Sequence, residues 1–473
     1  MSDESEPWMR LLRELFGDDA DAALEQLRGM GMDPAALAQA SGVADNPGMV
    51  DHLLGQIRAL MTQSQGEDVN WTLAHDVARG VAAEGGDPTI SAAVAATHRN
   101  AVTHAELWLD AATDFNPSTA EPKIWSRAEW VEASLPTWRY LAGPVATSVS
   151  LALGGLLREE QSEAFGDSPA SGLIGAVSPT VCGMHMGEAA GAMAREAFGS
   201  TDLGFPLLEE PRVVLIPRSI DDFTAGLEID RDNVLAFVAL REAAHVRLFG
   251  AASWLPGQLR TSIERYASGV TIDLEALDEA VRDAGMGDPK RLQQALSTGI
   301  FASGHSDEQL ATLESIETWL ALIEGWVDEV TTRAAAPHLP ELGQLREMMR
   351  RRRAAGGPAE DTFAKLLGLE LRPRRLRDAS ALWAELTSRV GPKARDDFWS
   401  HPDVLPTAAE LADWSSWVDR VTGKTEPDDF DRELERMLAG EADAESGSSG
   451  AAPEDGHEGP ESPGDSPQAP DAP

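Results

Sequence analysis

Residues 240–249 read LREAAHVRLF, and this stretch decides how the rest of the sequence is interpreted. Its apolar residues recur at helical spacing, and an aspartate shortly upstream is suited to cap a helix. Side chains four residues apart lie on one face of a helix, so Arg241 and His245 point the same way, with Glu242 one step round. The stretch therefore predicts a helix that presents a guanidinium, a carboxylate and an imidazole together.

This spacing is that of the motif His-Glu-x-x-His, in which two histidines bind zinc and the glutamate activates a water molecule. In this sequence Arg241 stands where the first histidine belongs. A guanidinium stays protonated and has no lone pair to donate. At about 5 Å it repels a divalent cation by several kcal/mol, even at an effective dielectric of about 20. We therefore expect Arg241 to replace the metal and to bind a carboxylate.

A second helical stretch, residues 323–328, supplies suitable carboxylates. Glu324 and Asp328 are four residues apart and share a helix face. In thermolysin-type zinc peptidases a Glu-x-x-x-Asp helix supplies the third zinc ligand and an aspartate that orients a zinc-bound histidine. If zinc is bound, the predicted ligands are His245 and Glu324, with Glu242 as general base and Asp328 behind the histidine. The alternative is that both acids lie on a solvated face.

Two further histidines are candidates for a missing ligand, His185 and His305. Nothing in their spacing ties either one to the motif, and a lone histidine is more often a hydrogen-bonded structural residue. Residues 212–217, RVVLIP, form the clearest strand of the sequence. In a zinc peptidase this strand would be the edge along which an extended peptide substrate pairs.

Taken together, five stretches resemble a bacterial family of zincin-like, zinc-dependent metalloproteases or hydrolases. They are VNWTLA at 69–74, AFGSTDLG at 197–204, LREAAH at 240–245, EGWVD at 324–328, and the segment from GGPAE at 356 to LRPRRL at 376. The resemblance covers roughly residues 65–425. It implies a zincin-like helical core, zinc as cofactor, and a peptide or protein substrate. Because Arg241 breaks the motif, the alternative is a catalytically inactive zincin-like protein whose cleft binds a peptide or protein partner.

The predicted fold class is mainly α with a small β-sheet, because only one stretch is clearly a strand. Asp87-Pro88-Thr89 is suited to a helix entry, and Ser306 with Gln309 predicts a capping box. We expect five parts: an N-terminal helical, partly flexible region 1–64, a helical domain 65–210, a zincin-like core 211–340, a C-terminal helical segment 341–425 and an acidic, mostly disordered tail 426–473.

The formal net charge of −40 argues against a nucleic-acid partner, because such a surface repels phosphate. Residues 426–473 alone hold 15 acidic and 2 basic side chains. The two basic clusters, at 350–353 and 372–377, are expected to pair with acidic groups of the same chain or to lie on a solvated helix face. The charge is compatible with basic peptides as partners, and the sequence does not indicate an oligomeric state.

Two uncharged runs, residues 141–157 and 171–187, are at the short limit for spanning a bilayer. Pro144 and Pro179 interrupt them, so we predict buried helices and no membrane association. The single cysteine, Cys182, excludes an intramolecular disulfide and fits a reducing compartment. The acidic N-terminus lacks the pattern of a signal peptide. These features together predict a cytoplasmic protein.

Overall fold

A computed structural model describes residues 68–164, 170–270, 306–354 and 375–423, together with Asp273 and Glu275. The region 1–64, His305, the start of the basic cluster 372–377 and the tail 426–473 lie outside the described residues. Of the described residues, those up to Val418 form one compact unit, and Asp419 begins a second. The described chain is mostly helical with one small sheet, which confirms the predicted fold class.

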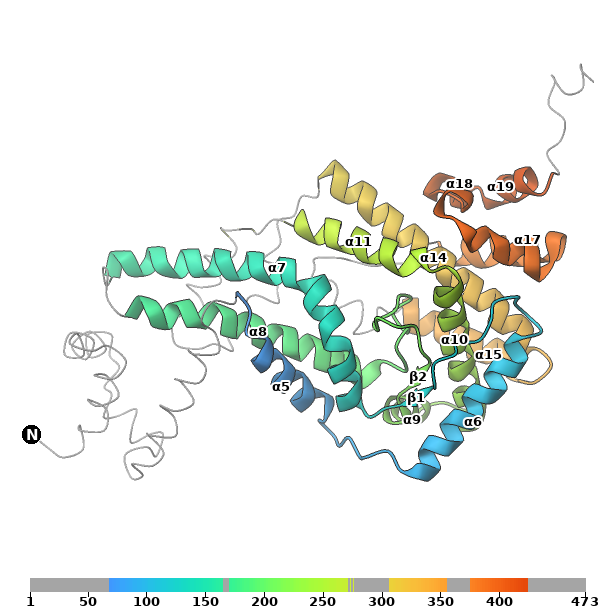
Figure 1. Cartoon of the computed structure of the whole chain (residues 1–473), viewed down its shortest axis with the longest axis horizontal. Coiled ribbons are helices and arrows are strands. Elements are labelled where there is room, and N and C mark those ends of the chain that lie inside the picture. The colour runs from blue at the N-terminus through green and yellow to red at the C-terminus, as the bar shows by residue number, and fades with distance from the viewer. Residues whose placement is uncertain are drawn as a thin grey trace, which may run out of the picture. The chain divides into compact units, whose positions relative to one another are not determined.

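The elements of the described chain are shown in Figure 1. The helices are α5 (Trp71–Ala82), α6 (Ala92–Leu109), α7 (Arg127–Ala164), α8 (Ala170–Glu196), α9 (Pro217–Thr224), α10 (Arg231–Ala251), α11 (Trp254–Ser268), α14 (Asp307–Ala335), α15 (Leu342–Ala354), α17 (Leu376–Asp396), α18 (Ala408–Ala412) and α19 (Trp414–Val421). The remaining elements are the 3-10 helices η4 (Asp397–Ser400) and η5 (Pro402–Val404) and the strands β1 (Lys123–Ile124) and β2 (Val214–Leu215).

Helix α10, which carries the LREAAH stretch, lies in the centre of the core. Its N-terminus is capped by Asp230, whose carboxylate accepts from the backbone N–H of Asp232. Nearly every side chain from Val234 to Phe249 is buried, as expected of a helix that is covered on all sides. It packs against α6 and α14 (Figure 1). The arginine, glutamate and histidine of the stretch are therefore core residues and not surface residues.

Helix α14 begins with the predicted capping box. The Ser306 hydroxyl accepts from the backbone N–H of Gln309, and the Gln309 side chain accepts from the backbone N–H of Ser306. The helix then runs for 29 residues and packs against α10, α11 and α17. Its second half is almost fully buried, which places Glu324 and Asp328 inside the molecule.

The small residues of α8 allow it to approach α5 closely. A Cβ atom on Gly187 would lie 2.5 Å from the carbonyl oxygen of Ala74, closer than side chains tolerate. Helix α8 also packs against α7 (Figure 1). Of the helices that the structure describes, none is both long and apolar enough to cross a membrane.

The helix entry predicted at Asp87-Pro88-Thr89 is wrong. Helix α6 begins at Ala92 and is capped by Ser91. The carboxylate of Asp87 instead accepts from the backbone N–H groups of Arg127, at 3.0 Å, and Ala128, at 2.9 Å. Asp87 therefore satisfies the first turn of α7, a helix about 40 residues further along the chain.

The strand predicted at 212–217 is shorter than expected, and neither of its sides is open. Strand β2 pairs in parallel with β1 on one side. On the other side Val214 N–H donates to the Glu242 carboxylate at 3.3 Å, and Ile216 N–H donates to the carbonyl oxygen of Phe198 at 2.9 Å. The prediction that an extended peptide pairs along this strand is therefore wrong, because the chain's own groups occupy that edge.

Candidate functional site

Helices α10 and α14 bring three of the predicted site residues together. Arg241 Nη2 lies 2.6 Å from Glu324 Oε2, and His245 Nε2 lies 2.9 Å from Glu324 Oε1. All three side chains are buried. The arginine in the first position of the motif therefore binds the carboxylate that a zinc ion would bind in a zinc peptidase.

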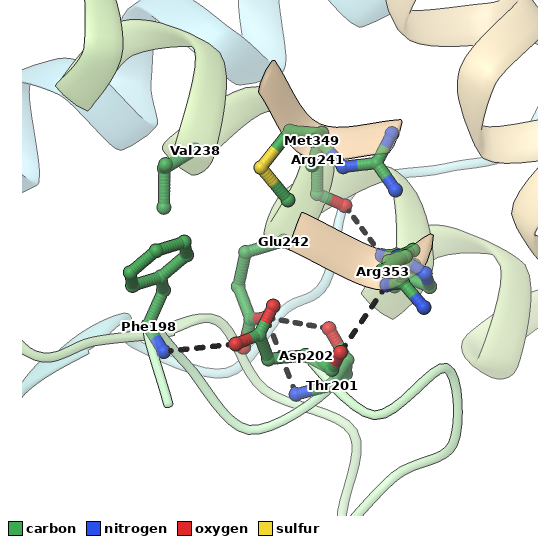
Figure 2. Close-up of a pocket in the computed structure, with 9 residues that line it drawn as sticks. Phe198, Thr201, Asp202, Val238, Arg241, Glu242, Met349 and Arg353 are labelled. Carbon is green, nitrogen blue, oxygen red and sulfur yellow. Dashed lines mark hydrogen bonds between the residues drawn. The ribbon is translucent and has the colours of Figure 1, made fainter. Parts of the chain in front are cut away.

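A third cation reaches the same carboxylate from α15. Arg353 Nη2 lies 2.6 Å from Glu324 Oε1. The same nitrogen donates to the carbonyl oxygen of Asp202 at 3.2 Å, and Figure 2 shows this second contact. Burial opposes ionisation of Glu324, but the charges of Arg353, His245 and Arg241 outweigh it and hold the pKa of Glu324 below its usual range. Glu324 is therefore an ionised carboxylate at the centre of a cationic cluster.

Both ring nitrogens of His245 face acceptors of the chain. Nδ1 lies 2.9 Å from the carbonyl oxygen of Arg241, and Nε2 lies 2.9 Å from the Glu324 carboxylate. Both partners can only accept, so the ring bonds to the carboxylate as an Nε2–H donor. A zinc ligand must be a neutral imidazole with a free lone pair. In this arrangement the ring is a donor to Glu324.

Five donors of the chain lie within hydrogen-bonding distance of the Glu242 carboxylate, and one of them, the Ser200 hydroxyl, also faces the carbonyl oxygen of Arg212. Oε1 accepts from the backbone N–H and the hydroxyl of Ser200, both at 2.7 Å, and from Val214 N–H at 3.3 Å. Oε2 accepts from the backbone N–H of Thr201 at 3.2 Å and from its hydroxyl. Burial raises the pKa of Glu242, and the hydrogen bonds of Thr201 and Ser200 oppose the rise. Glu242 thus ties α10 to β2 and to the 198–202 loop (Phe198–Asp202).

The 198–202 loop can approach Glu242 this closely because residue 199 is glycine. A Cβ atom at Gly199 would lie 2.5 Å from Glu242 Oε2 and 2.6 Å from the carbonyl oxygen of Val214. No side chain fits in that space. The glycine of the FGSTD sequence is therefore required for the loop to surround the Glu242 carboxylate.

Asp328 contacts α15 and not the histidine. It accepts two parallel hydrogen bonds from Arg346, Nε to Oδ1 at 3.0 Å and Nη2 to Oδ2 at 2.7 Å, and a third from Arg350 at 3.2 Å. Burial opposes its ionisation, but the hydrogen bonds and charge of Arg346 prevail and lower the pKa of Asp328. The side chain that was expected to orient His245 is held by arginines instead.

Helix α15 leaves little space over the motif. The remaining cavity has a volume of about 20 Å³, room for about one water molecule. Figure 2 shows its lining: Phe198, Thr201, Asp202, Val238, Arg241, Glu242, His245, Met349 and Arg353. Met349 and Arg353 both come from α15. A helix of the same chain therefore covers the motif and lines the small cavity beside it.

The residues present do not fit a zinc ion. His245 Nε2 lies at hydrogen-bonding distance from Glu324, and the guanidinium groups of Arg241 and Arg353 contact both oxygens of that carboxylate. Within the described ranges no group of three or more His, Cys, Asp or Glu side chains is placed to hold a metal. His185 lies half-buried on α8, a helix that packs against α5 and α7, and His305 lies outside the described residues.

The basic run on α15 pairs with acidic groups of the same chain, in line with the first of its two predicted alternatives. Asp328 binds Arg350, Glu347 binds Arg351, Asp202 binds Arg352, and Glu324 binds Arg353. Sequence reasoning identified this run but not its place at the motif. Asp202, Ser200 and Thr201 were noted only as part of the family resemblance, because no spacing rule connects them to α10.

A buried motif helix that meets a Glu-x-x-x-Asp helix beside a small sheet defines a helical, zincin-like protein. The chain belongs to the family of zincin-like metallopeptidases, whose sequence model matches residues 69–418. It is also similar to the crystal structure of a proposed hydrolase with a novel fold from Chloroflexus aurantiacus, at 17% identity. That match covers 75% of this chain and 98% of the other, with a TM-score of 0.51, and shows a shared fold. No curated protein sequence matches the chain.

Proposed function

We propose that this chain is a metal-free zincin-like protein, descended from hydrolases, that binds a peptide or protein partner and does not hydrolyse it. The observation that carries the proposal is the 2.6 Å contact between Arg241 Nη2 and Glu324 Oε2. A guanidinium in that position supplies the positive charge that a metal ion would supply, but it cannot bind and acidify a water molecule. The cluster therefore keeps the stabilising role of the zinc site and loses its chemistry.

The state of Glu242 supports the same proposal. An ionised carboxylate offers about four lone-pair sites, and four donors already face Glu242: the backbone N–H groups of Ser200, Thr201 and Val214 and the Thr201 hydroxyl. A general base must reach the proton that it removes, directly or through one water. In Glu242 no acceptor site is left for a nucleophilic water, so the residue acts as a structural carboxylate.

The metal content of the purified protein tests this proposal. After dialysis against zinc and then against metal-free buffer, we expect well under one zinc atom per chain by elemental analysis, because the cations of the cluster already satisfy Glu324. A full equivalent of zinc that survives dialysis, with zinc-dependent hydrolysis of a generic protein substrate such as casein, would contradict the proposal.

Restoring the missing histidine gives a second prediction. Arg241→His alone leaves Arg353 on Glu324 Oε1, so we expect only a small gain in zinc affinity. Arg241→His combined with Arg353→Met gathers two histidines and a glutamate, and should bind zinc tighter than either single variant by at least about tenfold in a competition titration. Arg241→His combined with Arg351→Met is the matched control, because the Arg351 side chain is 79% exposed. No gain in the first combination would mean that His245 and Glu324 cannot act as ligands together.

A further inference from the structure

We infer that the acidic cleft, defined by Asp202, Glu324 and Asp328, is a binding site for an arginine-rich helix of a partner protein, and that α15 fills this site in cis. The inference rests on the proposed function, since a hydrolase would need the same cleft open for its substrate. It names the chemistry of the partner: a helix with two apolar residues four apart and arginines beside them.

One face of α15 carries everything that the acidic cleft contacts. Leu345 and Met349, four residues apart, are buried. Arg353 lies on the same face, one turn after Met349. Arg346 lies beside Leu345 on that face, and Arg350 lies at its border. The opposite face carries Gly343, Gln344, Glu347 and Arg351, all of which are exposed. Helix α15 thus binds as an amphipathic helix does in the groove of a partner, through anchors at intervals of three and four residues.

Two of the three carboxylates of the acidic cleft, Asp328 and Asp202, recognise guanidinium geometry and not merely positive charge. Asp328 binds Arg346 through two parallel hydrogen bonds. Asp202 does the same with Arg352, at 3.0 and 2.8 Å. The guanidinium of Arg352 also stacks over the ring of Phe198, 4.0 Å from its centroid. Such bidentate and stacked contacts discriminate arginine from lysine.

The acidic cleft is built to keep its charge. Burial opposes ionisation of Asp202, but the Coulomb attraction and hydrogen bonds of Arg352 prevail, and the pKa of Asp202 is lowered. Glu324 and Asp328 are shifted in the same direction by their own arginines. Of the arginines that the structure places against these three carboxylates, all but Arg241 come from α15. The acidic cleft is therefore complete only when arginines fill it.

The contacts of α15 are suited to exchange with a partner. Leu345 and Met349 are buried, Leu342 and Met348 pack against the core partly buried, and the arginine side chains that bind Asp328 are partly exposed, Arg346 at 28% and Arg350 at 40%. Because solvent reaches Arg346 and Arg350, their pairs with Asp328 are more strongly screened by salt than the buried contact of Arg353 with Glu324. Because α15 follows α14 after a short connection, its effective concentration at the acidic cleft is high. A partner helix must therefore compete with α15, and loosening α15 should favour the partner.

The test uses the full-length chain and a fluorescent synthetic peptide of residues 342–354, with binding followed by anisotropy at low salt. A variant with Arg346→Ala and Arg350→Ala has a loosened α15 and an intact acidic cleft. We expect it to bind the peptide at least about tenfold more tightly than the unmodified chain. Adding Asp202→Asn should weaken binding by about tenfold or more, because one bidentate pair is lost. The single variant Arg350→Ala serves if the double variant does not fold, with a smaller gain in the same direction.

A peptide of the same composition in scrambled order is the essential control, because an acidic protein attracts any basic peptide. Equal binding of native and scrambled peptides, or binding that ignores Asp202→Asn, would overturn the inference. Zinc is measured in the same preparations. Stoichiometric zinc contradicts the proposed function, whereas metal-free protein without order-specific peptide binding contradicts only the assignment of the partner.

Discussion

Replacing Glu324 by alanine should lower the free energy of unfolding by about 3–5 kcal/mol. The change removes the carboxylate that binds Arg241, His245 and Arg353, and leaves their charges buried without a counter-charge. The desolvation of these groups is then no longer compensated. Urea unfolding followed by circular dichroism measures the loss as a shift in the transition midpoint.

Two controls make this result specific to the cluster. Arg241→Met leaves Glu324 paired with Arg353 and His245, so its cost should be smaller, about 1–2 kcal/mol. Glu347→Ala removes a carboxylate that is 51% exposed on the outer face of α15, and should change stability by less than about 0.5 kcal/mol. A loss for Glu324→Ala no larger than that for Glu347→Ala would show that the cluster is not buried as described.

Glu242→Gln is expected to lower the free energy of unfolding by about 2–4 kcal/mol, although the side chain keeps its shape. Both carboxylate oxygens accept from backbone N–H groups, of Ser200 and Val214 at Oε1 and of Thr201 at Oε2. In either orientation of the glutamine amide, the NH₂ group replaces one carboxylate oxygen. A backbone N–H group then faces another donor and is left without an acceptor. The comparison with Glu347→Gln, measured by the same unfolding transition, isolates this effect from the general cost of removing a charge.

This prediction separates the two roles of Glu242. A general base whose carboxylate faces a water molecule tolerates glutamine with little change in stability, since water reorients to suit the amide. A structural carboxylate does not. Unchanged stability in Glu242→Gln would therefore contradict the five-donor arrangement and return the residue to a catalytic role.

The sequence predicted those parts of the site that follow from helix geometry. The spacing of four between Arg241 and His245, and between Glu324 and Asp328, places each pair on one helix face whatever the tertiary structure. The charge argument also predicted that Arg241 would bind a carboxylate of the second helix, and the 2.6 Å contact with Glu324 has that form. The start of α14 was predicted from the capping box of Ser306 and Gln309, which also depends only on local spacing.

The remaining parts depend on contacts between distant segments. Nothing in the basic run 350–353 indicates that Arg353 would meet Glu324, because that contact requires α15 to turn back over α14. The prediction of an open edge along strand 212–217 was wrong for a similar reason. The backbone N–H of Val214 donates to Glu242, a residue 28 positions further along the chain. Asp87 has ordinary capping chemistry, but the helix that it caps starts at Arg127.

The double occupation of Glu324 by Arg241 and Arg353 has an evolutionary consequence. A lineage that regained a histidine at position 241 would still carry a guanidinium on the carboxylate, from a helix more than 100 positions away in the sequence. Either change alone alters the buried charge and leaves one guanidinium on the carboxylate, so the expected gain in metal affinity is small. If the proposed function holds, return to a zinc site needs two coordinated mutations, because each arginine alone still binds Glu324.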